Sequence, residues 1–275
     1  MDTTTKSALS KHIAGIIPVS KIDSDLDSFL HVSMMPIDNG FYAVQRSIVE
    51  CAYAGCKTIW IVCDDSIAPL IKKVCGDFIQ DPIAIINSKY KVFPQENTKS
   101  IPIFYVPLSY KNQNKDGLGV SVLDGITASY SVSSRISKWV VPQRYYVSSP
   151  YGVYDPYCIK DQREQILTND SFVLTCDNKS VFTNDHLGFS ISPKQFKHCN
   201  YLYKRMNTKT HFNLDIIFGD DIMRENMATG HVERHCNIKD WEGYQTLLKE
   251  ELCFESVSFW KSLFTGNIKK NERLL

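Results

Sequence analysis

At 275 residues the chain can form one large domain or two small ones, and 43% hydrophobic against 22% charged residues is an ordinary globular composition. Its 31 basic side chains nearly balance its 30 acidic ones, which excludes a strong overall field for nucleic acid or an anionic membrane. No apolar run approaches the roughly 18 residues of a membrane span, and the start of the chain is polar. We therefore expect a protein of the cytoplasm, with no secretion signal and with neither membrane nor nucleic acid as a partner.

The pattern of the first 75 residues alternates between strands and helices. Residues 13–19 form a short apolar run that is typical of a strand buried on both faces. Apolar residues then recur at helical spacing over residues 42–53, and Gly55 is placed to end that helix. Residues 58–63 predict a second buried strand, and residues 67–74 predict another helix.

The middle of the chain continues this alternation. Residues 101–108 are a third strand candidate, and the apolar spacing that follows them, at Val120, Leu123 and Ile126, predicts a helix. A fourth strand is expected within residues 139–147, although a proline inside it disfavours a central position there. Residues 148–156 are then expected to be a loop, because they are rich in serine, proline and glycine.

The last third of the chain predicts two more strands and one helix. The strands are expected at residues 171–176 and 187–192, joined by a polar turn. The helix is expected over residues 240–252, and one of its faces collects the apolar side chains Trp241, Tyr244, Leu247 and Leu248.

Strands that alternate with helices are joined by right-handed crossovers into a parallel sheet. The predicted fold class is therefore α/β, with an open, mostly parallel, Rossmann-like sheet and helices on both faces. We expect a polar segment over residues 1–10, a single domain over residues 11–255 and a C-terminal tail over residues 256–275, in which the lysine-rich stretch 269–273 is solvated. Ligands of such sheets bind beyond the carboxyl ends of the strands, which here lead into residues 20–27 and into Asp64 and Asp65.

Cysteine usage indicates reduced thiols in the core. The cysteines are odd in number and form no CxxC pair, which argues against a disulfide framework and against a cysteine zinc site. Several lie inside apolar runs, where a reduced cysteine behaves as a small core residue. The nine positions are Cys51, Cys56, Cys63, Cys75, Cys158, Cys176, Cys199, Cys236 and Cys253.

Two stretches carry a resemblance to a known family. IIPVSKIDSDLDSFLHVSMMPI at residues 16–37, with its following helix and AGCKTIWIV at residues 54–62, resembles the opening of the sugar-nucleotide pyrophosphorylases and related nucleotidyltransferases. CNIKDWEGYQTLL at residues 236–248 resembles their closing stretch. The resemblance implies a nucleotide-diphospho-sugar transferase-like fold. It also implies transfer of a nucleotidyl group from a nucleoside triphosphate to a sugar phosphate or similar acceptor, with Mg²⁺.

The chain departs from this family where its chemistry is concentrated. The family's phosphate loop is rich in glycine and contains arginine, whereas residues 20–27 hold no glycine, three aspartates and Lys21 as their only cation. Lys21 is therefore the candidate phosphate-binding catalytic residue. The family's closing pair of metal-binding aspartates corresponds to Asn237 and Lys239, and Lys239 would oppose a metal ion. For the first metal-binding aspartate the resemblance offers Asp155, which Pro156 also suits to a turn.

Further candidate site residues follow strands or precede helices. Asp220 and Asp221 follow an apolar run and are candidate Mg²⁺ ligands, or alternatively an N-cap for the next helix. Asp64 lies where a cofactor or nucleotide would bind, with a helix cap as the rival interpretation. Gly117 and Gly119 lie in a turn that leads into a helix, where backbone amides can hold a phosphate.

Two other clusters remain open from sequence alone. His231 and His235 would share one face of a helix and could bind a metal, but the neighbouring glycine and asparagine favour irregular structure with surface histidines. Five tyrosines crowd one loop, where aromatic rings either recognise a ligand or pack beneath the loop. They are Tyr145, Tyr146, Tyr151, Tyr154 and Tyr157.

Two hypotheses of different classes follow. The first is a Mg²⁺-dependent nucleotidyltransferase whose partners are a nucleoside triphosphate and a sugar phosphate. The second is a catalytically inactive relative that binds protein partners as a structural or interaction subunit. Such a subunit would suit a larger assembly, for example a viral one in the host cytoplasm or the virion. Converging carboxylates would favour the first hypothesis, and scattered carboxylates the second.

Overall fold

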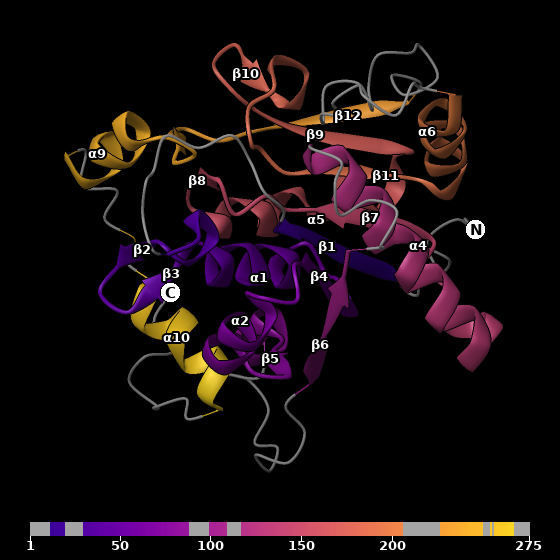
Figure 1. The fold of residues 1–275 in the computed structure, drawn as a ribbon, viewed down its shortest axis with the longest axis horizontal. Coiled ribbons are helices and arrows are strands. Elements are labelled where there is room, and N and C mark those ends of the chain that lie inside the picture. Colours follow the sequence, from indigo (N-terminus) through magenta and orange to yellow (C-terminus); the bar gives the residue numbers. More distant parts are fainter. Residues whose placement is uncertain are drawn as a thin grey trace, which may run out of the picture.

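A mixed sheet of nine strands forms the centre of the computed structural model, which describes residues 12–19, 30–87, 99–108, 117–205, 226–249, 254 and 256–266 (Figure 1). The strand order is β10-β9-β11-β7-β1-β4-β6-β5, and β12 also pairs with β9. The bounds are β1 Ile13–Val19, β4 Thr58–Cys63, β5 Phe78–Gln80, β6 Ser100–Pro107, β7 Arg144–Val147, β9 Ser171–Cys176, β10 Lys179–Ser180, β11 Phe189–Ile191 and β12 Met227–His231.

The core of the sheet is parallel, as the alternation in the sequence predicted. β7, β1, β4 and β6 all run in one direction, with Ile17 of β1 opposite Ile61 of β4. β5 is antiparallel to β6, and β11 is antiparallel to both of its neighbours, β7 and β9. Because β11 reverses direction between them, β9 and its partner β12 point the same way as the parallel core. The carboxyl ends of β1, β4, β6, β7, β9 and β12 therefore lie at one edge of the sheet.

The order of the strands creates a switch point between β1 and β7. From β1 the chain continues to β4 and β6 on one side, and only then returns to add β7 on the other side. At the end of this pair the amide of Ser148 donates to the carbonyl of Ile16 at 3.1 Å. In open α/β sheets the crevice beyond such a switch point is the usual place for a ligand.

Helices cover both faces of the sheet. A Cβ on Gly15 of β1 would lie 2.8 Å from Sγ of Cys51 in α1, whereas the next residue, Ile16, packs against Gly125 of α4. Because adjacent strand residues point to opposite faces, α1 and α4 lie on opposite faces. The helices are α1 Ala43–Tyr53, α2 Ala68–Cys75, α3 Pro82–Asn87, α4 Leu118–Ile136, α5 Ile159–Thr168, α6 Pro193–Arg205, α9 Trp241–Lys249 and α10 Val257–Thr265.

Short elements complete the described part of the fold. Two small antiparallel sheets pair β2 with β3 and β8 with β13, so the stretch expected as a loop at residues 148–156 contains a strand. They are β2 Pro36–Asp38, β3 Phe41–Tyr42, β8 Gly152–Val153 and β13 Cys236–Asn237, and the 3-10 turns are η2 Val32–Met34, η5 Lys138–Val140, η6 Pro156–Cys158 and η7 Val181–Thr183. No helix in the described ranges combines the length and apolarity that crossing a bilayer requires.

The carboxyl-terminal region differs from the expectation. The helix predicted over residues 240–252 is α9, described over 241–249, and residues 250–252 lie outside the described part of the chain. The buried side chains of α9 are Tyr244 and Leu247, whereas Trp241 and Leu248 are 51% and 58% exposed. Residues 257–265, expected as part of the C-terminal tail, form α10, and the lysine-rich stretch 269–273 lies outside the described residues. Its Trp260 is fully buried, packs on Phe41 and donates from Nε1 to the hydroxyl of Tyr53 at 3.3 Å.

The cysteines behave as the sequence predicted. Eight of them lie in the described ranges, all as free thiols, and seven of these are buried. Cys158 is the half-buried exception, and Cys253 lies outside the described residues. Burial raises the pKa of Cys63 to about 12, with smaller contributions from Asp64 and Asp65. Such thiols are packing residues.

Candidate active site at the carboxyl edge of the sheet

Three chain segments meet at the carboxyl edge around the switch point. β4 ends at Cys63 and is followed by Asp64, which is half-buried, and by the exposed Asp65. β7 is followed by residues 148–154, here named the edge loop. Tyr151 of the edge loop is buried, and burial, with a smaller contribution from the Asp64 carboxylate, raises its pKa. Because β1 pairs with both β4 and β7, the segments that follow these two strands leave the sheet on either side of β1.

The first turn of α4 supplies the third segment. Gly117 is the N-cap residue, and its φ of 115° is a conformation that favours glycine. Gly119 lies in the first turn and is buried. The first amides of a helix have no partner within it, so they are suited to an anionic group. Lys21, Asp220 and Asp221, the other candidates from sequence, lie outside the described residues.

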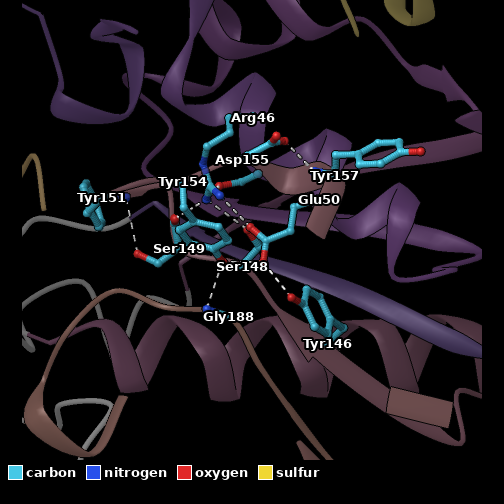
Figure 2. Close-up of polar contacts among 11 residues, drawn as sticks. Arg46, Glu50, Tyr146, Ser148, Ser149, Tyr151, Tyr154, Asp155, Tyr157 and Gly188 are labelled. Atoms are coloured by element: carbon cyan, nitrogen blue, oxygen red, sulfur yellow. Dashed lines mark hydrogen bonds and ion pairs between the residues drawn. The ribbon is translucent and has the colours of Figure 1, made fainter. Parts of the chain in front are cut away.

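Beneath the edge loop lies a buried ion pair that the sequence did not reveal (Figure 2). Arg46 and Glu50 occupy successive turns of α1, are both fully buried, and bond through Nη1 and Oε2 at 2.7 Å. The same Oε2 accepts from Ser148 Oγ at 2.5 Å, and Oε1 accepts from the hydroxyls of Tyr146 and Tyr154, each at 2.6 Å. The carboxylate thus accepts four hydrogen bonds, which compensates for its removal from water.

Arg46 extends this arrangement to the next residue of the loop. Its Nη2 donates to the carbonyl of Ser149 at 2.8 Å and to Ser148 Oγ at 3.3 Å, and its guanidinium lies 4.5 Å from the ring centre of Tyr154. Burial opposes its charge, but Glu50 and Tyr154 together outweigh burial, so the pKa of Arg46 lies above its usual value. We call Arg46, Glu50, Ser148, Ser149 and Tyr154 the Glu50 network. It joins α1 to both ends of the edge loop.

The tyrosine cluster divides into packing and accessible residues. Four of the five are at most 1% exposed, and these are Tyr145, Tyr146, Tyr151 and Tyr154. Tyr157 is half-buried and contacts Tyr53 edge to face, with 5.6 Å between ring centres. Most of the cluster therefore packs beneath the loop, and only Tyr157 is placed to meet a ligand.

Asp155 lies in a different environment from Asp64. Its exposed carboxylate caps η6 by accepting from the amide of Tyr157 at 2.8 Å (Figure 2). Asp155 and Tyr157 line a cavity of about 570 Å³ between the start of α5 and the connection from β12 to β13, where Glu233 and Arg234 also lie. Asp64 does not line this cavity.

The segment with His231 and His235 is not helical. His231 ends β12 and is exposed, as expected, but His235 is partly buried, with its ring centre 6.2 Å from that of Tyr154. A further histidine, His186, is buried edge to face against Tyr151 at 5.4 Å. Burial lowers the pKa of His235 to about 4 and that of His186 to about 3. Among the residues that the structure describes, no three His, Cys, Asp or Glu side chains are grouped to hold a metal ion.

The closing stretch of the family resemblance lies beside the edge loop. Asn237 of β13 pairs with Gly152 of β8, and its Oδ1 accepts from the amide of Lys239 at 3.2 Å. A Cβ on Gly152 would collide with the carbonyl of His186, so only glycine fits between these segments. The stretch that resembles the family's closing motif is thus attached to the edge loop through β13 and β8.

Comparisons with known proteins identify the fold. No protein-family model and no curated protein matches the chain. Its structure is similar to that of an inositol-1-phosphate CTP transferase from T. maritima, with 9% identity, a TM-score of 0.54 and coverage of 89% of this chain and 98% of that one. It is also similar to 4-diphosphocytidyl-2C-methyl-D-erythritol synthase from Anaerococcus prevotii, with 12% identity, a TM-score of 0.53 and coverage of 88% and 96%.

A third similar structure is a UDP-glucose pyrophosphorylase complexed with UDP-glucose, with 12% identity, a TM-score of 0.54 and coverage of 87% of this chain and 98% of that one. At these identities the similarity concerns the fold. It extends over nearly the whole of each neighbour, which confirms the resemblance seen at the two ends of the sequence. The chain has the α/β fold of the nucleotidyltransferases.

Proposed function

We propose that the chain binds a nucleoside triphosphate at the carboxyl edge and transfers its nucleotidyl group to a phosphorylated sugar or similar acceptor. The observation that carries this proposal is the switch point between β1 and β7 in a chain with the nucleotidyltransferase fold. At the same edge of the sheet, Asp64 follows β4, the edge loop follows β7, and α4 is the next described element after β6. In the similar UDP-glucose pyrophosphorylase, the bound molecule is a nucleotide sugar.

The reaction would be an in-line displacement at the α-phosphorus. A phosphate oxygen of the acceptor forms the new bond, the bond to the β-phosphate breaks, and pyrophosphate leaves with that electron pair. In this proposal, Gly117 and Gly119 contribute the amides at the start of α4, which suit the phosphates. Asp64 contacts the nucleotide, and Lys21, which lies outside the described residues, is the candidate phosphate-binding cation. The catalytic role of Asp155 stays a prediction from the sequence.

The magnesium ion implied by the resemblance needs more ligands than the described residues offer. No three suitable side chains are grouped among them, and the half-buried Asp64 after β4 and the exposed Asp155 that caps η6 belong to different segments. Asp220 and Asp221, the proposed metal ligands, lie outside the described residues. The reaction described above therefore includes no step at a metal ion, and the experiment below is run with and without the metal.

A thermal-shift panel of ribonucleoside and deoxyribonucleoside triphosphates, each with and without Mg²⁺ or Mn²⁺, tests the proposal. A ligand that binds the folded state raises the melting temperature, so one nucleotide should stabilise the protein. Asp64→Asn should reduce that shift in melting temperature. Asp65→Asn changes the neighbouring, exposed carboxylate and should leave the shift unchanged. Release of pyrophosphate on adding a sugar phosphate would then establish transfer. No shift with any triphosphate would contradict the proposal.

A specific observation favours the second candidate, an inactive interaction subunit. Trp60 of β4 stacks on Phe104 of β6 with 4.3 Å between ring centres, and Phe104 is 37% exposed. Phe78 of β5 is 46% exposed and pairs with Pro102, two residues before Phe104, so it lies on the same face. Contiguous exposed apolar surface is typical of a protein contact. A flat nucleotide panel, with self-association that Phe104→Asp abolishes in light scattering, would favour this candidate.

A further inference from the structure

We propose that Arg46 and Glu50 are positioning residues that hold the edge loop in the geometry that contacts the nucleotide. That the ligand is a nucleotide rests on the proposed function, whereas the positioning of the loop does not. Neither side chain reaches solvent, so neither touches the ligand directly. They act through Ser148, Ser149 and Tyr154.

Both ends of the edge loop bond to one carboxylate. Ser148 is the first residue of the loop and Tyr154 is the last, and their hydroxyls donate to the two oxygens of Glu50 at 2.5 and 2.6 Å (Figure 2). Glu50 therefore sets the distance between the two ends of the loop. A loop with its ends fixed in this way has few conformations left to lose when a ligand binds.

Arg46 orients the backbone of the edge loop near its start. Arg46 Nη2 donates to the carbonyl of Ser149 at 2.8 Å, which orients this peptide group toward α1. The Ser149 hydroxyl in turn accepts from the amide of Tyr151 at 3.4 Å. The hydrogen bonds thus run from Arg46 through Ser149 to Tyr151, in the middle of the edge loop.

Stability alone does not require an ion pair at this buried position. A buried ion pair is often no more stabilising than apolar residues of the same volume, because desolvation cancels the attraction. Here Glu50 of the pair also accepts hydrogen bonds from the hydroxyls of Ser148 and Tyr154. The carboxylate of Glu50 accepts four hydrogen bonds and both Nη atoms of Arg46 donate, although Arg46 Nε has no partner among the described residues. So many directed bonds favour one geometry, which suits a positioning role.

The structure contains a matched control for this role. Tyr146 also donates to Glu50 at 2.6 Å, but it belongs to β7 rather than to the edge loop. Tyr146→Phe, Tyr154→Phe and Ser148→Ala each remove one hydroxyl from the same carboxylate. The first leaves both ends of the loop attached, whereas each of the other two releases one end.

The experiment measures the dissociation constant of the stabilising triphosphate found in the panel, for all three variants at a temperature where each is folded. We expect Ser148→Ala and Tyr154→Phe to weaken binding about tenfold or more, and Tyr146→Phe to change it less than about twofold. Equal weakening in all three, or in none, would overturn the positioning role. All three variants lose one bond to Glu50, but Ser148→Ala also removes an acceptor of Arg46 Nη2 and Tyr154→Phe removes the acceptor of the Gly188 amide. The free energy of unfolding of each variant is therefore measured as well, and a purely structural role predicts that the weakening of binding follows the loss of stability.

A second measurement separates this inference from the proposed function. Amide hydrogen exchange of residues 148–154 should accelerate about tenfold in Ser148→Ala and Tyr154→Phe but not in Tyr146→Phe, without any nucleotide present. If the wild-type protein binds no triphosphate, the proposed function fails and exchange alone decides whether the loop is positioned. Unchanged exchange in all three variants would overturn the inference even if a nucleotide binds.

Discussion

The backbone of Gly188 lies directly against the carboxylate of Glu50. A Cβ on Gly188 would collide with Glu50 Oε1 and crowd the hydroxyl of Tyr154, which itself accepts from the Gly188 amide at 3.0 Å. The segment that leads into β11 thereby closes the Glu50 network on the side opposite to α1. The glycine is required by space, since its backbone is not in the left-handed region.

We expect Gly188→Ala to lower the free energy of unfolding by about 2–3 kcal/mol, because the added methyl displaces a buried, hydrogen-bonded carboxylate. Ser190→Ala, on the same strand segment, is the matched control. Ser190 is buried and its hydroxyl has no hydrogen-bond partner among the described residues, so its loss should cost less than about 0.5 kcal/mol. Urea denaturation measures both. Similar values for the two variants would contradict the close contact.

Acidification should destabilise the protein through His186 and His235. Their pKa values in the folded state, about 3 and about 4, lie below the ordinary value of 6.5, so the unfolded chain binds more protons in between. Their stabilising contribution is complete above about pH 6.5 and decreases as the pH falls, by up to about 1.4 kcal/mol per pH unit for each histidine. The cause is burial, reinforced at His186 by Lys239 and His235.

The check is urea denaturation of the wild type and of His186→Phe between pH 4.5 and 8. Carboxylates titrate over the lower part of this range in both proteins, so the difference between the two curves isolates the histidine. We expect the variant to lose less stability than the wild type on acidification. Parallel curves would show that His186 titrates normally in the folded protein.

Arg144 should contribute more to stability than its ion pair suggests. Its Nε and Nη1 donate to the carbonyls of Leu167 and Asp170 at 3.2 and 2.9 Å, whereas the Asp170 carboxylate lies 3.7 Å away and is 53% exposed. We expect Arg144→Ala to cost about 2–3 kcal/mol, because two backbone carbonyls lose their donor. Asp170→Asn should cost less than about 1 kcal/mol, since exposed ion pairs contribute little. Thermal or urea unfolding decides between the two, and an Asp170→Asn effect as large as that of Arg144→Ala would contradict this account.

The cysteines predict a pattern of chemical labelling. Seven thiols are buried in the described ranges, and burial raises the pKa of Cys63 and of Cys75, so little reactive thiolate forms. Iodoacetamide at pH 8, followed by peptide mass spectrometry, should modify these seven only after unfolding. Half-buried Cys158 is the internal comparison: burial raises its pKa as well, so its greater exposure is what should make it react first among the described thiols. Labelling of a buried thiol in the native protein would indicate local opening.

The central strands were predictable because their environment is uniform. β1, β4 and β9 are buried on both faces, so each is a continuous apolar run, and the predicted ranges 13–19, 58–63 and 171–176 agree with the structure. The fourth strand was expected from residue 139 but begins after Pro142, at Arg144, because proline cannot complete the ladder. Local chemistry was sufficient for these elements.

The Glu50 network was not predictable, because its contacts join distant parts of the chain. Arg46 and Glu50 are spaced like a surface pair on a helix, and the bonds of Glu50 to Tyr146 and Tyr154 span 96 and 104 residues. Residues 148–156 read as a loop whose side chains could face either way. The burial of Trp260 in α10 was missed for the same reason, since its partner Phe41 lies at the other end of the sequence.

The position of β1 between β4 and β7 also has a consequence for synthesis on the ribosome. β4 follows β1 closely, but β7 begins only at Arg144, so one edge of β1 lacks its partner until more than half of the chain has been translated. An unpaired edge exposes backbone donors and acceptors to other chains. Nascent chains that stall before Arg144 should therefore aggregate or bind chaperones, whereas chains released beyond β11 can close the central sheet.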